Sequence, residues 1–82
     1  MTSPGPCVLA IDLGTSGCKA AVVTLAGNVV GAGRVPIETI HLPDGGAEQD
    51  PESVWSAVKL ACRNALAAAA VPSSDVRAVI CA

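Results

Sequence analysis

A short polar segment between two apolar stretches holds the residues whose types and spacing could do chemistry. It reads Asp12-Leu13-Gly14-Thr15-Ser16-Gly17-Cys18-Lys19. Backbone N–H groups in a glycine-bounded turn can converge on an anion, and side-chain hydroxyls add further donors. Such a turn predicts a phosphate site. Its expected members are four turn residues and one lysine: Gly14, Thr15, Ser16, Gly17 and Lys19.

Asp12 stands just before this turn and has a separate expected role. A carboxylate repels a phosphate unless a cation such as Mg²⁺ lies between them, directly or through water. Asp12 is therefore the candidate metal-binding residue, and Lys19 could add a point charge on a phosphate oxygen. Two plainer interpretations stay open: Asp12 can accept hydrogen bonds within an ordinary hairpin turn, and Lys19 can end a solvated strand.

The elements that must position these residues are predicted from apolar patterning. Residues 7–13, 19–25 and 29–35 each form a short apolar run, and short turns separate them. They predict a three-stranded antiparallel meander whose first strand is buried on both faces. Gly31 and Gly33 fall on one face of the third strand, which predicts a bulge or a neighbour packed close to its backbone.

A loop, a helix and a fourth strand follow the meander. Residues 36–49 predict a long loop, and Asp50 as N-cap with Pro51 after it predicts a helix to about residue 70. The apolar residues at helical spacing form one stripe: Val54, Val58, Ala61, Cys62, Ala65, Leu66 and Ala69. Residues 76–82 predict a strand parallel to the first. The expected fold is α/β, with sheet order 3-2-1-4 and the helix on one face.

Composition narrows the classes of protein to which the chain could belong. The chain has 82 residues, an apolar fraction of 51%, a charged fraction of 15% and a net charge of −2. These values favour one small folded domain over residues 7–82, after a disordered tail at residues 1–6. The weak, scattered positive charge disfavours a nucleic-acid partner, and no apolar run approaches the roughly 20 residues that span a bilayer. Without a secretory signal pattern, the expected location is the cytoplasm.

The remaining residues with chemical potential have simpler expected roles. The four cysteines, Cys7, Cys18, Cys62 and Cys81, are widely spaced with no close pair, so we expect reduced and mostly buried thiols and no zinc site. Trp55 is expected to pack between helix and sheet. His41 is expected to be a plain loop residue, and Glu48 a loop residue that could approach a substrate.

Two motifs together resemble one family. Asp12-Leu13-Gly14-Thr15-Ser16 is similar to the first phosphate motif, Asp-x-Gly-Thr-[Ser/Thr], of the actin-like ATPase and sugar kinase superfamily. The stretch Glu48-Gln49-Asp50-Pro51 with Trp55 resembles Glu-[Gln/His]-Asp-Pro-x-x-x-Trp of the FGGY carbohydrate kinases. Gln49 looks closer to xylulose kinases, since glycerol kinases more often carry histidine there. The resemblance covers residues 8–82.

The resemblance implies a fold, a reaction and its cofactors. It implies a ribonuclease-H-like, actin-like ATPase domain, incomplete here because the chain stops inside an apolar strand at Ala82. It implies ATP and Mg²⁺ as cofactors and transfer of the γ-phosphoryl group to a sugar or polyol hydroxyl, with a xylulose-like ketose favoured. The catalytic base is an aspartate expected further along. No catalytic residue therefore falls within these residues, and the 82-residue chain alone is expected to be inactive.

Two other functions stay open. One is another ATPase of the same superfamily, such as a heat-shock chaperone, which shares the Asp12 motif. The other is a non-catalytic binding module or a truncated kinase relic. The expected partner in the leading hypothesis is a small sugar or polyol, without nucleic acid or membrane, and the sequence carries no signal for an oligomeric state.

Overall fold

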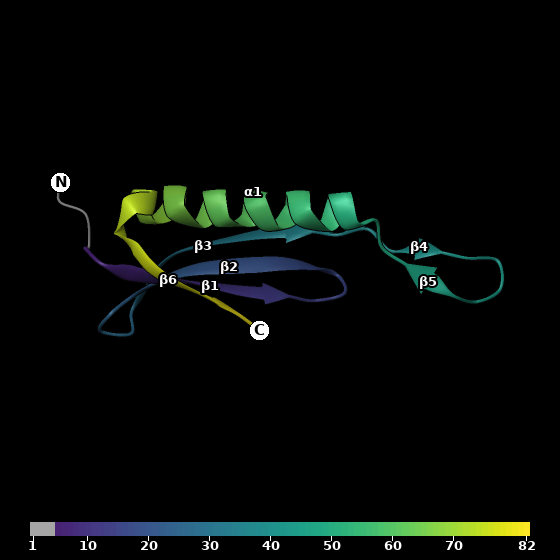
Figure 1. The fold of residues 1–82 in the computed structure, drawn as a ribbon, viewed down its shortest axis with the longest axis horizontal. Helices are drawn as coiled ribbons and strands as arrows, with labels where there is room; N and C mark the ends of the chain where they lie inside the picture. Colours follow the sequence, from purple (N-terminus) through teal and green to yellow (C-terminus); the bar gives the residue numbers. More distant parts are fainter. Residues whose placement is uncertain (1–4) are drawn as a thin grey trace.

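The computed structural model describes residues 5–82, and it places one helix over one face of a four-stranded sheet (Figure 1). The predicted tail at residues 1–6 therefore lies mostly outside the described residues. The elements in chain order are β1 (Cys7–Leu13), β2 (Gly17–Thr24), β3 (Val29–Pro36), β4 (Ile40–His41), β5 (Ala47–Glu48), α1 (Pro51–Ala69), a 3-10 turn η1 (Ser73–Asp75) and β6 (Val76–Cys81).

The main sheet has the predicted topology. Its strand order is β3-β2-β1-β6, and the first three strands form the antiparallel meander. β6 returns after the helix and pairs with β1 in parallel, as a crossover connection favours. The expected order 3-2-1-4 is confirmed, with β6 as the fourth strand of this sheet.

Local chemistry explains where α1 begins and ends. The Asp50 carboxylate accepts hydrogen bonds from the Glu52 backbone N–H at 3.3 Å and the Ser53 hydroxyl at 3.1 Å, which caps the first turn. The helix ends at Ala70, whose φ of 53° is left-handed. The predicted helix over residues 51–70 is confirmed to within one residue.

The helix lies unusually close to β3 because two glycines face it. A Cβ atom on Gly31 would lie 2.5 Å from the Ala69 backbone nitrogen, and one on Gly33 would lie 2.5 Å from the Ala61 carbonyl oxygen. Ala61 and Ala65 are fully buried in this contact. The predicted close neighbour is confirmed, and a register shift between β2 and β3 supplies the bulge as well.

Three expectations about burial are wrong, because α1 lies over β2 and β3 on one face of the sheet and leaves the other face, and the β1–β6 side of its own face, uncovered. On β1, Leu9 is buried against the helix whereas Val8 on the opposite face is only half-buried. Trp55 does not pack between helix and sheet; its side chain is 58% exposed, and the Lys59 ammonium lies 5.7 Å from its ring centroid. Cys81 is exposed, although Cys7 and Cys18 are buried as expected, and all four cysteines are free.

The long loop at residues 36–49 contains structure that the sequence did not predict. β4 and β5 pair as a small antiparallel hairpin that projects past the end of the main sheet (Figure 1). Its turn is closed by the Asp44 carboxylate, which accepts a hydrogen bond from the Gly46 N–H at 2.8 Å, and Gly45 takes a φ of 89°. Two-residue strands lack the apolar alternation that marks longer ones, so the pattern gave no signal.

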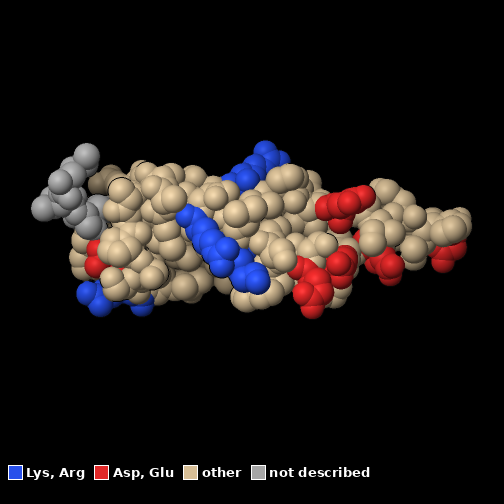
Figure 2. Space-filling view, turned by 90° about the horizontal axis from the view of Figure 1, so that it is seen from above, with Lys and Arg blue, Asp and Glu red and all other residues tan. Residues whose placement is uncertain are grey.

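Charge is unevenly distributed along the molecule. Figure 2 shows most acidic side chains toward the end that carries the hairpin, while the basic ones lie elsewhere. The hairpin and the start of α1 supply five acids, namely Glu38, Asp44, Glu48, Asp50 and Glu52. Among residues 5–82, no helix is both long and apolar enough to cross a membrane.

Candidate functional site

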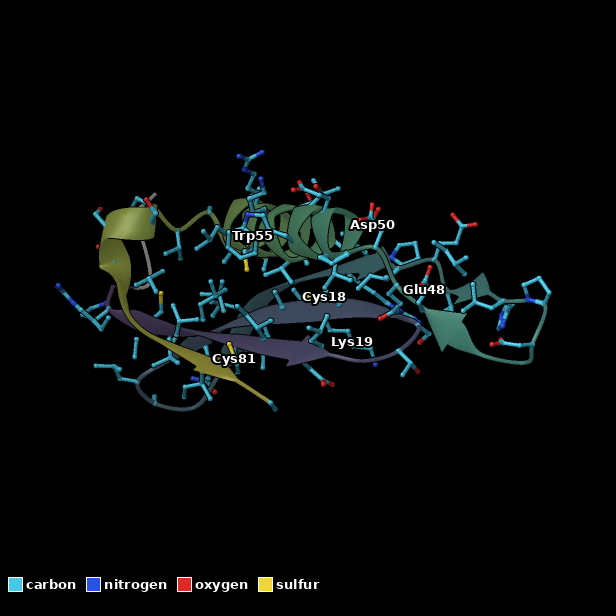
Figure 3. The ribbon with its side chains drawn as sticks, turned by 45° about the vertical axis from the view of Figure 1, so that its right-hand side comes forward. Cys18, Lys19, Glu48, Asp50, Trp55 and Cys81 are labelled. Atoms are coloured by element: carbon cyan, nitrogen blue, oxygen red, sulfur yellow. The ribbon has the colours of Figure 1, made fainter. Side chains whose placement is uncertain are left out.

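Three charged side chains lie in a row across the meander. In the strand register, Asp12 on β1 lies opposite Lys19 on β2, and Lys19 lies opposite Arg34 on β3. Their neighbours in sequence, such as Ala20, face the helix and are buried, so the row occupies the opposite face, where all three residues are exposed. Figure 3 shows Lys19 at the end of the sheet that also carries Glu48 and Asp50.

This row borders a small hollow beside the β1–β2 turn. The hollow has a volume of about 120 Å³ and is lined by Asp12, Gly14, Ser16, Gly17, Lys19 and Arg34. The structure thus brings together five of the six predicted site residues. Thr15 is the exception, because it lines a neighbouring hollow on the hairpin side.

Arg34 is a site residue that sequence reasoning missed. A count outward from the β2–β3 turn pairs Val23 with Val29, and continuing that count would place Gly33 opposite Lys19. The register shift between Val22 and Val23 moves the pairing by one residue and brings Arg34 opposite Lys19 instead. Because a one-residue slip reverses the face of every side chain, only the bulge puts Arg34 at this hollow.

Three carbonyl groups of the turn already accept hydrogen bonds, one from within the turn and two from outside it. The Gly17 carbonyl accepts from the Gly14 N–H at 2.9 Å, and the Ser16 carbonyl accepts from the Ile37 N–H at 3.1 Å. The Thr15 carbonyl accepts from the Gln49 side-chain amide at 2.7 Å. Three successive oxygens are therefore fixed by partners inside and outside the turn.

The N–H groups of the same turn are left available. Within the described residues 5–82, the backbone N–H groups of Thr15 and Ser16 donate to no protein atom. Both residues are exposed. A turn whose oxygens are occupied while its N–H groups stay open presents partial positive charge, which is the chemistry that binds an anion.

The two glycines of the turn have different structural duties. A Cβ atom on Gly17 would lie 2.8 Å from the Val35 carbonyl oxygen and 3.3 Å from the Pro36 Cα, so β3 excludes a side chain there. A Cβ atom on Gly14 would meet only the Gly17 oxygen, at 3.6 Å, an ordinary contact. Positive φ angles occur at neither residue. Of these two glycines, only Gly17 is required by close packing.

The second sequence motif reaches the first in space. The Gln49 amide nitrogen donates to the Thr15 carbonyl at 2.7 Å and to the Thr39 hydroxyl at 3.3 Å. Thr39 itself donates to the Thr15 carbonyl at 3.5 Å. With Ala47 and Glu48, these three residues line a hollow of about 260 Å³. Glu48 is exposed and lies beside this neighbouring hollow rather than the one at Lys19.

The one carboxylate at the hollow, that of Asp12, could share a metal ion with a phosphate. No cluster of three His, Cys, Asp or Glu side chains suited to a metal occurs among residues 5–82, so Asp12 is the single carboxylate at the hollow. Mg²⁺ commonly takes one or two carboxylates from the protein and completes its shell with phosphate oxygens and waters. Asp12 therefore fits Mg²⁺ held together with a phosphate.

The nearby thiols stay neutral. Burial raises the pKa of the Cys18 thiol above its ordinary 9.0, and the negative charges of Asp12 and Cys81 raise it further. Burial also raises the pKa of Cys62, followed by the influence of Cys18 and Cys81. Since the thiolate is the nucleophilic form, the raised pKa values lower the reactivity of Cys18 and Cys62 at neutral pH.

Comparison with known proteins identifies the class. The family model described as "FGGY family of carbohydrate kinases, N-terminal domain" matches residues 7–82. The chain is 36% identical over 75 residues to a glycerol kinase of Allorhizobium ampelinum, and 37% identical over 73 residues to one of Coxiella burnetii. These alignments cover 92% and 88% of this chain but only 15% and 14% of the relatives.

The chain therefore belongs to the FGGY family of carbohydrate kinases, within its N-terminal domain. This membership confirms the family that the two motifs suggested, together with the α/β, actin-like ATPase fold. The chain spans about one seventh of the length of the curated relatives that it matches.

Proposed function

We propose that this chain forms part of an ATP-dependent kinase that transfers the γ-phosphoryl group of ATP to a hydroxyl of a sugar or polyol. The observation that carries the proposal is the β1–β2 turn, whose three carbonyls are occupied while the Thr15 and Ser16 N–H groups remain open. The turn lies beside two cations and one carboxylate, Lys19, Arg34 and Asp12. Family membership supports the same chemistry.

Each residue of the site has a proposed part in holding ATP. The N–H groups of Thr15 and Ser16, with the Ser16 hydroxyl, donate to phosphate oxygens. Gly14 leaves room for the phosphate to approach the backbone, and Gly17 lets the turn that holds the phosphate lie against β3. Lys19 and Arg34 neutralise charge that spreads over the phosphoryl oxygens in the transition state. Asp12 holds Mg²⁺ or its waters, and the ion's charge offsets the repulsion between carboxylate and phosphate.

The acceptor is proposed as a class. The relatives reported above are named glycerol kinases, whereas Gln49 in place of histidine favours a ketose such as xylulose. A three-carbon polyol and a five-carbon ketose share primary hydroxyls that a carboxylate base can deprotonate. The proposed base is an aspartate outside residues 1–82, so residues 7–82 act as part of a larger nucleotide-binding domain. Free thiols support a reducing location, the cytoplasm.

The test is a coupled ADP-release assay on the complete gene product. It is supplied with ATP, Mg²⁺ and, in turn, glycerol, D-xylulose and other polyols and ketoses. The proposal predicts ADP release that requires one of these acceptors. ADP release without any acceptor would favour another ATPase of the superfamily, and no release with any acceptor would favour a non-catalytic module.

A further inference from the structure

The side chain of Gln49 is the main contact between the two sequence motifs, and its role is not explained by packing alone. It comes from the residue just before the N-cap of α1, 34 residues away from the Thr15 carbonyl that it contacts. The side chain is half-buried, and it makes two hydrogen bonds, to the Thr15 carbonyl and the Thr39 hydroxyl. Because a carbonyl can only accept, the amide nitrogen must face Thr15.

The geometry of the peptide link gives this contact a consequence on the other side of the turn. The Thr15–Ser16 peptide is planar and trans, so its C=O and N–H point in opposite directions. Gln49 holds the Thr15 oxygen toward the hairpin hollow. The Ser16 N–H is thereby turned the other way, toward the hollow that Ser16 lines with Asp12 and Lys19.

We propose that Gln49 is a positioning residue for phosphate binding: its amide fixes the Thr15 carbonyl and so presents the Ser16 N–H to the phosphate. Without this hydrogen bond only the longer 3.5 Å contact from the Thr39 hydroxyl holds the Thr15 oxygen, so the peptide can rotate more easily, and a carbonyl oxygen facing the phosphate would repel it. This proposal rests on the proposed function of the β1–β2 turn. It adds the residue that sets the orientation of the turn.

The experiment follows the Thr15–Ser16 peptide itself. The complete gene product is labelled with carbonyl-¹³C threonine and ¹⁵N serine, so that only Thr–Ser links give a correlated signal. In this chain those links are Thr2–Ser3 and Thr15–Ser16. Pyrophosphate is the probe, titrated by NMR, and the ATP KM and the melting temperature are measured on the same samples.

Gln49→Met keeps the length of the side chain and removes both N–H donors, whereas Gln49→His restores an N–H donor. We expect pyrophosphate to shift the Ser16 N–H signal in the parent protein. Gln49→Met should move the Thr15 carbonyl signal. It should also weaken pyrophosphate binding about tenfold and raise the ATP KM about tenfold, the effect of one good hydrogen bond. Gln49→His should recover most of this loss, and KM for the acceptor should stay constant throughout.

Asp44→Ala is the matched control. It removes the hydrogen bond to the Gly46 N–H in the same hairpin and leaves the contact to Thr15 intact, so pyrophosphate affinity should not change. A Gln49→Met protein that melts earlier but binds pyrophosphate as tightly as the parent would overturn the proposal, because Gln49 would then be structural. The proposal would also be overturned if pyrophosphate never shifts the Ser16 N–H signal. If pyrophosphate binds as expected but no acceptor is phosphorylated, the kinase assignment fails and the role of Gln49 stands.

Discussion

The two turns of the meander both join antiparallel strands and differ in how their carbonyl groups are satisfied. The β2–β3 turn closes on itself: Gly27 N–H donates to the Thr24 carbonyl, Thr24 N–H donates to the Asn28 carbonyl, and Asn28 N–H donates to the Thr24 hydroxyl. The β1–β2 turn has its Thr15 and Ser16 carbonyls held by Gln49 and Ile37, which lie outside it.

Both turns leave N–H groups that donate to no protein atom within residues 5–82: those of Leu25 and Ala26 in the β2–β3 turn, and those of Thr15 and Ser16 in the β1–β2 turn. At the β1–β2 turn the surrounding structure also takes the acceptors, and two cations stand beside the open donors, which is the arrangement proposed to bind an anion. Three predictions test this comparison, from the largest expected effect to the smallest, and a fourth and smaller effect tests the burial of two thiols.

The largest effect is expected at Lys19. Lys19→Met removes the ammonium while keeping a similar length of side chain, and it should lower kcat/KM of the complete gene product about a hundredfold, the scale of losing one preorganised electrostatic contact. Steady-state kinetics with varied ATP measure it. Lys59→Met is the control, because Lys59 lies over Trp55 on α1; there kcat/KM should be unchanged. Equal losses in both variants would contradict the site.

A glycine pair tests the two turns directly. Gly17→Ala forces a methyl group against the backbone of β3, so we expect a loss of about 1–3 kcal/mol in the free energy of unfolding and a clear rise in ATP KM. Gly27→Ala strains a residue with a φ of 92° and should cost about 1–2 kcal/mol with ATP KM unaltered. Chemical denaturation and ATP kinetics separate the two results. A rise in the ATP KM for Gly27→Ala would show that the two turns do not differ in their effect on ATP binding.

A smaller effect is expected at Arg34. Its guanidinium is exposed and acts beside Lys19, so Arg34→Met should raise ATP KM about threefold, in keeping with the modest worth of exposed charge pairs. The rise should shrink as salt is added. Arg77→Met on the exposed β6 strand is the control and should not alter KM. If the ATP KM of Arg34→Met equals that of the Arg77→Met control, Arg34 does not belong to the site.

The smallest effect concerns pH and lies outside both turns. The pKa values of Cys18 and Cys62 are raised in the folded chain, so the folded state holds protons that the unfolded state releases. Stability is therefore fully present below the ordinary pKa of 9.0 and falls as pH rises through the raised values. Urea midpoints from pH 7 to 10 measure the decline. Replacing both thiols by alanine should flatten it, and an unchanged slope would contradict the assignment.

Local signals made most of the fold predictable. Asp50 and Pro51 marked the start of α1, and apolar runs marked the strands of the main sheet. The predictions failed where contacts between residues far apart in sequence determine the structure. Trp55 is exposed because it lines an open groove between α1 and the uncovered β1–β6 side of the sheet, and the β4–β5 hairpin is too short to carry a periodic pattern.

The candidate site was predictable only in part, for the same reason. The turn and its flanking charges are contiguous in sequence, so Asp12 to Lys19 could be found as one motif. Arg34 depends on a one-residue bulge, and Gln49 depends on a hydrogen bond across 34 residues. Gly31 and Gly33 suggested a bulge but did not fix its position, and the hydrogen bond has no local signature. The second motif suggested a family, and the structure gave Gln49 a physical contact with the first.

The most direct test of the central claim is a crystal structure of the complete gene product with Mg²⁺ and a non-hydrolysable ATP analogue. We expect phosphate oxygens within about 3 Å of the Ser16 nitrogen and of the Lys19 ammonium, and the metal or one of its waters bound to the Asp12 carboxylate. Phosphates bound elsewhere, with the Ser16 N–H still open to solvent, would contradict it.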